Sequence, residues 1–229
     1  MKPDIESVSF IFGDRNTLLL MGSGSMSPFR DSAFIVQTNT KTVTAFLVDT
    51  FFRRIKNESI KQINIEGAAS TPWGMILSNR GNKSYPKNHL IFTSNNFWAD
   101  QYNAPLKILP VGSNSDSSVF LGISGLCYSG ISDRLLLTVS TEETYSTHKD
   151  GTIGKSYLWI IDDISAKQKF SAINPNKIID LSVIDKKLSH QKIESVCIIS
   201  ENNKKMLLAF TADNDDGKTT IFEMSLKKK

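Results

Sequence analysis

Long hydrophobic stretches are missing from this chain of 229 residues. No apolar run approaches the ~20 residues that a membrane-spanning helix requires, so a helical span is not expected. The first residues, MKPD, lack the apolar core of a secretion signal, and the sequence as written therefore predicts a cytoplasmic location. The formal net charge is only +4 and no clustered basic face is evident, so nucleic acid is not an expected partner.

Histidine and cysteine are scarce, which narrows the chemistry that the chain can support. Only three histidines and two cysteines are present. No Gly-x-Ser-x-Gly elbow occurs, so a Ser–His hydrolase is disfavoured. No His/Cys group has zinc-ligand spacing, and no phosphate-binding loop motif is present. No residue can therefore be assigned a catalytic role from a motif.

A six-residue phrase occurs four times along the chain. It reads IESVSF at 5–10, IEGAAS at 65–70, ISGLCY at 123–128 and IESVCI at 193–198. The steps between first positions are 60, 58 and 70 residues. Repetition at such periods is the signature of folds built from repeated supersecondary units, each of which needs its neighbours to bury a core.

Further short apolar runs follow each phrase. Second runs lie at 18–21, 74–77, 135–139 and 206–210, third runs at 33–37, 89–93, 156–161 and 220–224, and fourth runs at 43–48, 106–111 and 178–184. Short runs of this kind, bounded by Gly, Asn, Asp and Ser, indicate strands. Residues 38–41 and 213–218 are expected to form hairpin turns. Residues 49–56 show helical spacing, which predicts one connecting helix with Thr50 as its cap.

The repeats predict an all-β fold, a β-propeller built from four-stranded antiparallel blades. We expect a single domain with repeats at about 5–60, 61–118, 119–188 and 189–229. A β-sandwich would not produce four matching phrases, and the coils of a β-helix are much shorter. The fourth repeat ends after three runs. The fourth blade is therefore short, or the ring is an N-terminally incomplete five-bladed one.

Small residues alternate along the phrase, as expected for the crowded innermost strand of a blade. The third position is Ser or Gly in every repeat, and the fifth is Ser9, Ala69, Cys127 or Cys197. The two cysteines are therefore interpreted as small buried side chains. A disulfide between them is the minor alternative, because equivalent positions on different repeats need not come within bonding distance.

Several segments carry a resemblance to a known group of proteins: IEGA at 65–68, SNRGN at 78–82, SGLCYS at 124–129, STEET at 140–144 and DGTIGKS at 150–156. They resemble an uncharacterised bacterial β-propeller family, distantly similar to the esterase-like phytase propellers, which also carry a Glu-Gly phrase on an inner strand. The resemblance covers essentially the whole chain and implies a propeller without an assigned activity. It also implies relatives that are longer at the N-terminus by about one blade.

Acidic residues recur at the second position of the phrase, as Glu6, Glu66 and Glu194. In an antiparallel meander the first strand begins at the edge where the second strand ends, so these glutamates share a face with the loops after the second strands. The predicted ligand-binding set on that face is Glu6, Glu66, Arg80, Glu142, Glu194, Asp213 and Asp215, with Glu143 and Arg30 nearby. The alternative is that the three glutamates are structural and accept backbone N–H bonds between blades.

Two functions fit these features. The first is a non-catalytic propeller that binds a small molecule or a protein at this polar, acidic face. The second is a metal-dependent hydrolase of phosphoesters, esters or lactones, with calcium as the most suitable cation and Glu66, Glu194 and Asp213 as its ligands. In either case, an incomplete ring leaves open blade edges, which predicts self-association.

Overall fold

A computed structural model describes residues 3–112, 120–142, 153–214 and 217–228. Four antiparallel sheets make up the chain, and each is an up-and-down meander in sequence order. Blade 1 consists of β1 (Ile5–Ile11), β2 (Asp14–Gly22), β3 (Ser32–Gln37) and β4 (Thr42–Leu47). Blade 2 consists of β5 (Ile65–Thr71), β6 (Gly74–Asn79), β7 (Asn88–Thr93) and β8 (Lys107–Val111).

The other two sheets complete the series. Blade 3 consists of β9 (Leu121–Ser129), β10 (Arg134–Glu142), β11 (Ile153–Ile161) and β12 (Lys177–Asp180), and blade 4 of β13 (Ile193–Glu201), β14 (Lys205–Asp213) and β15 (Thr219–Lys227). The repeated phrase forms the first strand of every blade. The predicted all-β propeller is confirmed, with three blades of four strands and a last blade of three described strands.

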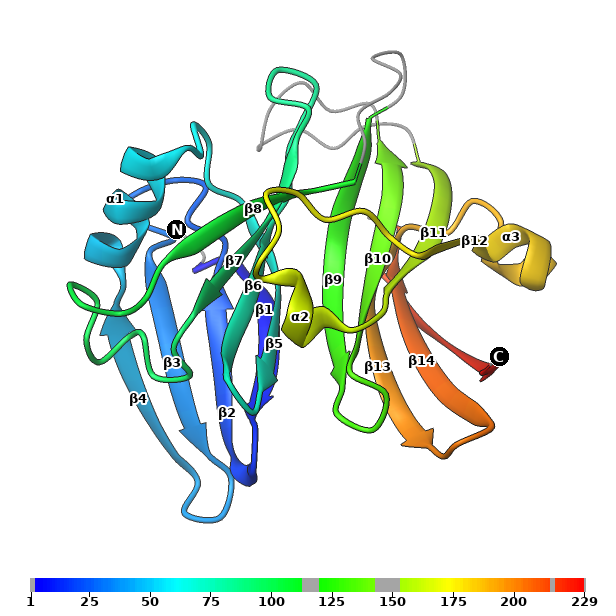
Figure 1. Ribbon diagram of the computed structural model, residues 1–229, viewed down its shortest axis with the longest axis horizontal. Helices are drawn as coiled ribbons and strands as arrows, with labels where there is room; N and C mark the ends of the chain where they lie inside the picture. Colours follow the sequence, from blue (N-terminus) through cyan, green and yellow to red (C-terminus); the bar gives the residue numbers. More distant parts are fainter. Residues whose placement is uncertain (1–2, 113–119, 143–152, 215–216, 229) are drawn as a thin grey trace.

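The first strands of successive blades lie side by side. β5 packs against β1, β9 against β5, and β13 against β9. Hydrogen bonds cross these junctions: Phe12 N donates to Ser70 Oγ (2.8 Å), and Ser124 Oγ donates to the carbonyl oxygen of Ile193 (2.6 Å). Figure 1 shows the sheets following one another from β1–β4 on the left to β13–β15 on the right.

Apolar side chains fill the space between successive blades in three clusters. Between blades 1 and 2 the cluster includes Leu19, Met21, Ile65 and Leu77. The cluster between blades 2 and 3 contains Ile76 of β6 and alternate residues of β10, and the cluster between blades 3 and 4 contains Leu136 of β10 and alternate residues of β14. Each blade is therefore held by neighbours on its faces, as the repeat pattern predicts.

The connecting helix is present as α1 (Asp49–Glu58), and it buries Phe51, Phe52 and Ile55 in the first cluster. The predicted cap was wrong, because the cap position is Val48 and no side chain caps the helix. Asp49 in the first turn and Arg53 form an ion pair one turn apart at 3.1 Å. The burial of three large apolar side chains accounts for this helix without a cap.

Two other expectations need correction or completion. Residues 178–184 were predicted as one strand, but β12 ends at Asp180 and a short helix, α3 (Leu181–Ile184), follows. The Asp180 side chain accepts a hydrogen bond from the backbone N–H of Ser182 (3.0 Å), which starts this helix. The hairpin turn at 38–41 is confirmed between β3 and β4. The second predicted turn contains Asp215 and Asp216, which lie outside the described residues.

The remaining helical segments are short. They are α2 (Ile164–Lys167) and the single 3₁₀ turn Lys186–Leu188. None of the helices in the described part of the chain has the length and apolar character needed to cross a membrane.

The two cysteines are free, and their surroundings differ. Cys127 is half-buried, and burial raises the pKa of its thiol to about 11. Cys197 is exposed, so the prediction that both are buried was wrong for this residue. Its face of blade 4 points away from blade 3, and no described blade covers it.

Candidate functional site

The four blades place their polar loops at one end, here called the polar end. At this end, the first strand of a blade begins beside the last residues of the second strand: Ile5 pairs with Gly22, Ile65 with Asn79, and Ile193 with Ala212. It lies toward the top of Figure 1. Because the second residue of each phrase follows these pairs, Glu6, Glu66 and Glu194 all stand at this end. The expectation that they share an end with the loops after the second strands is met by the register.

Glu66 and Arg80 form a buried charged pair between blades 2 and 3. They are 8% and 7% exposed, and Arg80 Nη1 stands 4.0 Å from Glu66 Oε1. The same Oε1 accepts a 2.6 Å hydrogen bond from Asn64 Nδ2. Arg80 Nη2 reaches Ser140 Oγ of blade 3 at 3.5 Å. A buried charge is tolerated only with such partners, so this pair fixes the end of β6 against blade 3.

Gly122 of β9 makes room for the Arg80 side chain. A Cβ added at Gly122 would overlap Arg80 Nε and would stand 3.1 Å from Arg80 Cζ. The next blade is thus shaped around the guanidinium.

Glu6 stands at the beginning of blade 1 among other acidic groups. Although Glu6 as a residue is exposed, its surroundings raise the pKa of its carboxyl to about 7. Burial of the carboxyl is the largest cause, followed by the negative charges of Asp4 and Glu194. Asp4 itself is paired with Arg30 (2.6 Å) and accepts a hydrogen bond from a serine hydroxyl. Carboxylates of blades 1 and 4 are therefore close enough for the charge of Glu194 to affect Glu6.

Glu194 has a basic neighbour from its own blade. Lys192 Nζ lies 3.3 Å from Glu194 Oε1, and both side chains are largely shielded from solvent. At the equivalent position of blade 3, Ser124 replaces the glutamate and donates a hydrogen bond to the backbone carbonyl of Ile193 in β13.

The other predicted residues are only partly described. Asp213 is exposed at the end of β14. Glu142 ends β10, but its side chain lies outside the described part, and Asp215 and Glu143 lie outside it altogether. Within the described residues, no three His, Cys, Asp or Glu side chains form a group able to hold a metal ion. The ligand set Glu66, Glu194 and Asp213 stays a prediction.

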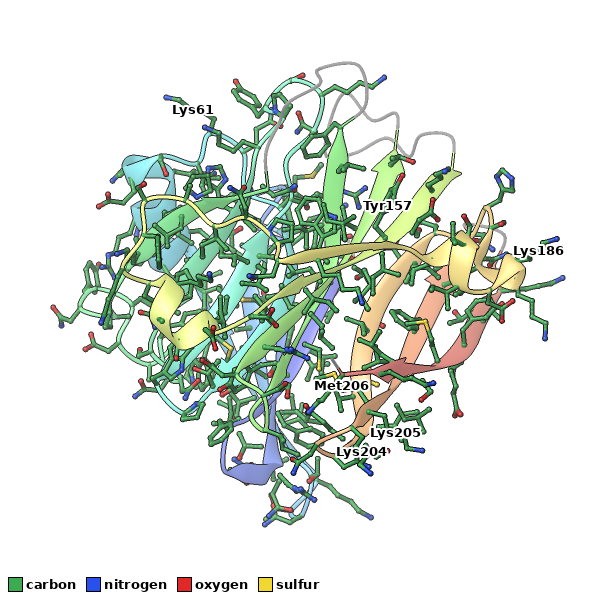
Figure 2. All side chains as sticks on the ribbon, turned by 45° about the vertical axis from the view of Figure 1, so that its right-hand side comes forward. Lys61, Tyr157, Lys186, Lys204, Lys205 and Met206 are labelled. Atoms are coloured by element: carbon green, nitrogen blue, oxygen red, sulfur yellow. The ribbon has the colours of Figure 1, made fainter. Side chains whose placement is uncertain are left out.

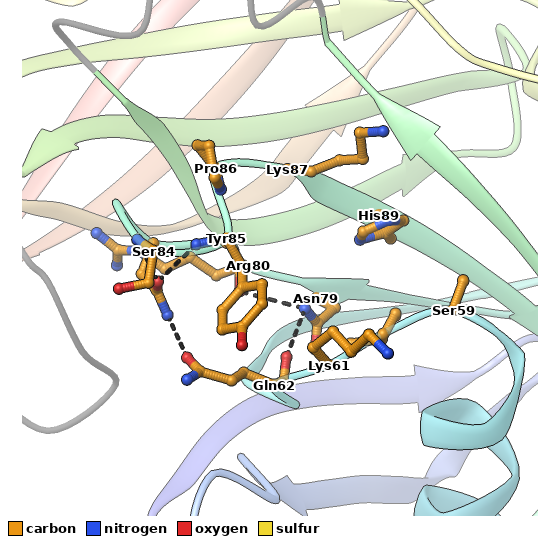
Figure 3. Close-up of a pocket in the computed structure, with 13 residues that line it drawn as sticks. Ser59, Lys61, Gln62, Asn79, Arg80, Ser84, Tyr85, Pro86, Lys87 and His89 are labelled. Atoms are coloured by element: carbon orange, nitrogen blue, oxygen red, sulfur yellow. Dashed lines mark hydrogen bonds between the residues drawn. The ribbon is translucent and has the colours of Figure 1, made fainter.

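A pocket of about 370 Å³ opens at the polar end, on the side of blade 2. It lies between the connector from α1 to β5 and the loop from β6 to β7. Its lining is mostly polar and basic and includes Lys61, Gln62, Asn82, Lys87 and His89. Figure 3 shows Lys61 and Gln62 on one side and Pro86 and Lys87 on the other, with the Tyr85 side chain between them.

Hydrogen bonds hold the two walls of this pocket together. Asn79 Oδ1 accepts from the backbone N–H of Asn64 (2.8 Å), and Asn79 Nδ2 donates to the carbonyl oxygen of Gln62 (3.3 Å). Asn82 Nδ2 donates to Gln62 Oε1 (2.6 Å). The pocket is therefore preformed by the loop that begins at Arg80.

The charge of the pocket is positive. Among the residues that the structure describes, its lining includes two lysines and an arginine but no aspartate or glutamate. Burial and the charge of Lys87 lower the pKa of His89 to about 4, so His89 is neutral near pH 7. Arg80 belongs to the lining, but its guanidinium engages Glu66 and blade 3.

Sequence reasoning found Arg80 and missed the other pocket residues. Lys61 and Gln62 lie in a connector that the four phrases do not include, and Tyr85, Pro86 and Lys87 lie in a loop of blade 2. The clustering of Arg80, Lys83 and Lys87, with Lys61 before them, was the available signal of a basic site.

Fold and register together define a class: a β-propeller whose blades begin with the repeated phrase and carry polar loops at one end. The chain belongs to a family of unknown function, DUF6910, whose sequence profile matches residues 1–217. A search among curated proteins gave no match.

Proposed function

We propose that this protein is a non-catalytic propeller that binds a small anionic ligand in the pocket at its polar end. The observation that carries the proposal is the preformed cavity of about 370 Å³, which basic and amide side chains line and to which no carboxylate of the described residues contributes. Cavities of ~300–1,000 Å³ are the usual size of small-molecule sites. An anionic group near Lys61 and Lys87 would gain charge-assisted hydrogen bonds.

The ligand class follows from the two walls. The Tyr85 ring and Pro86 offer apolar surface, and Lys61 and Lys87 supply positive charge. A flat ring that carries a phosphate or carboxylate group fits both. In this proposal Glu66 is a positioning residue: it pairs with Arg80, and Arg80 begins the loop that forms one wall.

Calorimetric titration with three probes tests the proposal: inorganic phosphate, citrate and 4-nitrophenyl phosphate. We expect 4-nitrophenyl phosphate to bind more tightly than inorganic phosphate, because only it also contacts the apolar wall. The double variant Lys61→Gln, Lys87→Gln should weaken binding at least tenfold, which corresponds to the loss of about 1.4 kcal/mol.

The matched control removes the same charge elsewhere. Lys204 and Lys205 stand at the end of the molecule opposite Lys61, as Figure 2 shows, and both are exposed. Lys204→Gln, Lys205→Gln should leave binding unchanged. Equal weakening by both double variants, or no binding of any probe, would refute the pocket. Release of 4-nitrophenol in the presence of calcium would instead support the metal-dependent hydrolase.

A further inference from the structure

Blade 1 has a large apolar face that no described part of the chain covers. Register pairs define two rows of neighbours across its strands: Val8, Leu20, Phe34 and Ala45 form one row, and Phe10, Leu18, Val36 and Val43 form the other. All eight side chains are apolar, and Val8, Phe10 and Val43 are 58%, 52% and 62% exposed. We call this set the backward face of blade 1. The solvent-facing side of a sheet normally carries polar residues, so the apolar composition of the backward face indicates a surface that becomes buried.

The equivalent position is buried in every other blade. Val8 is the fourth residue of the phrase, and its counterparts Ala68, Leu126 and Val196 are only 3%, 7% and 4% exposed. In each case the preceding blade covers the residue. In the other three blades, the covering surface is the side that a blade turns toward the next blade along the chain, here called its forward face. The repeat therefore specifies that the forward face of a blade of the same kind would cover blade 1.

The contacts at the existing junctions give the register of such a face. The third phrase position of one blade meets the fourth of the next, since a Cβ on Gly67 would stand 2.9 Å from Leu126 Cγ. The fifth position meets the sixth: the backbone N–H of Ser70 donates to Ser9 Oγ (3.1 Å). The same pairing recurs between blades 3 and 4, where the backbone of Ile198 hydrogen-bonds to Cys127.

Blade 4 presents an uncovered face of this type. Its rows are Cys197, Ala209 and Glu223, and Ser195, Thr211 and Ile221. The inner residues are small, as they are on the forward faces of the other blades, and Cys197 and Ile221 are exposed. Among the described elements, β13 packs beside β9, and Val8 of blade 1 and Cys197 of blade 4 are both exposed, so this face and the backward face of blade 1 do not meet within one chain.

We propose that the forward face of blade 4 packs on the backward face of blade 1 of a second copy of this chain. The reciprocal contact then forms by two-fold symmetry, and the two copies close a common ring of blades. The chain itself carries the one face that the repeat requires, and the large side chains of blade 1 meet the small ones of blade 4. In a dimer with two such contacts, both faces of each copy are covered. If the contacts did not close into a ring, each copy would bind a further copy and a filament would form.

The junction register predicts one pair of neighbours across the proposed contact. Cys197, at the fifth position, should lie beside Phe10 of the second copy, at the sixth. The variant Phe10→Cys should therefore form disulfides between copies under mild oxidation, and Cys–Cys geometry is strict enough to make this a sharp probe. We expect a covalent dimer on a non-reducing gel, absent when Cys197→Ser is added. The control is Val183→Cys on α3, which is at least as exposed but lies on neither face.

Oligomeric state gives a second measurement that does not depend on the disulfide. Light scattering across a dilution series should show a dimer that dissociates to a monomer. Val43→Glu on blade 1 should raise the concentration at which half of the dimer is dissociated at least tenfold. Val183→Glu makes the same change at another exposed valine and should leave that concentration unchanged. Both substituted side chains are exposed in one chain, so loss of folding is not expected, and circular dichroism checks this.

Each other outcome overturns the proposal. A monomer at all concentrations shows that a second copy does not cover these faces. A disulfide within a single Phe10→Cys chain shows that blade 4 closes on blade 1 of the same molecule. A ladder of covalent oligomers shows head-to-tail growth in place of the two-fold ring. Failure of anion binding would leave this result unaffected, because the pocket residues belong to neither face.

Discussion

Gly122→Ala is the substitution whose effect the structure defines most directly. The added methyl group would occupy the space of Arg80 Nε and would stand 3.1 and 3.2 Å from Cζ and Cγ of the same side chain. No positive φ restricts this position, so the backbone accepts alanine. The methyl must therefore displace Arg80 from Glu66 and from Ser140 of blade 3, or separate blades 2 and 3.

The magnitude is a balance of two effects. Overpacking of this kind costs ~1–3 kcal/mol. Replacing glycine by alanine restricts the unfolded chain, which recovers ~0.4–1 kcal/mol. We expect a net destabilisation of about 1–2 kcal/mol, which lowers the unfolding temperature by ~2–8 °C in a chain of this size. Thermal and urea unfolding followed by circular dichroism measure it.

A double-mutant cycle with Arg80→Met isolates the cause. In that background the guanidinium is absent, and Gly122→Ala should be neutral or slightly stabilising, which gives a coupling of about 1–2 kcal/mol. Gly130→Ala is the control, because its Cβ would meet only the rings of Phe12 and Tyr128, at 3.4 and 3.7 Å. Equal costs of Gly122→Ala with and without Arg80 would refute the reasoning.

Three further predictions concern titration and metal binding. The pKa of Glu6 is raised from 4.5 to about 7, so ionisation of this carboxyl destabilises the fold as pH rises through that range. Glu6→Gln should therefore raise the melting temperature at pH 8 and leave it unchanged at pH 4. The pKa of His89 is lowered from 6.5 to about 4, so the fold loses stability as pH falls through that range, by at most about 3 kcal/mol. In His89→Gln, the free energy of unfolding measured with urea should depend less on pH between 6.5 and 4. If calcium binds at the polar end, the native chain should melt higher with calcium than with magnesium or chelator, and Glu66→Gln should lose that difference; a more stable Glu66→Gln variant without any metal response would leave only charge repulsion.

The fold was readable from the sequence because one strand of each blade is tightly constrained. The innermost strand has small residues at its third and fifth positions, where the next blade approaches, and larger ones at its fourth and sixth. The small third and fifth positions recur in all four copies, and the larger fourth and sixth in every copy except that of blade 2. This pattern placed β1, β5, β9 and β13 correctly. The helix α3 was missed because a local event, the capping of Ser182 by Asp180, overrode the apolar run.

The polar end was only partly readable. Its carboxylates belong to the repeated strand, so their common location followed from the meander. The pairing of Glu66 with Arg80 depends on the junction with blade 3 and on the space left by Gly122, which no local pattern reveals. The basic pocket was missed because its residues come from a connector and a loop that do not repeat.

Binding and ring closure rest on different parts of the molecule. The pocket belongs to blade 2 and to the connector after α1, and blade 2 has blade 1 on one face and blade 3 on the other within a single chain. Glu6 and Glu194, in contrast, lie on the two end blades, whose uncovered faces would meet a second copy. Dilution that separates the copies should therefore leave the affinity for 4-nitrophenyl phosphate unchanged, while the pKa of Glu6 should move, because burial is its largest cause. An affinity that fell together with dimer dissociation would show instead that the pocket is completed by the second copy.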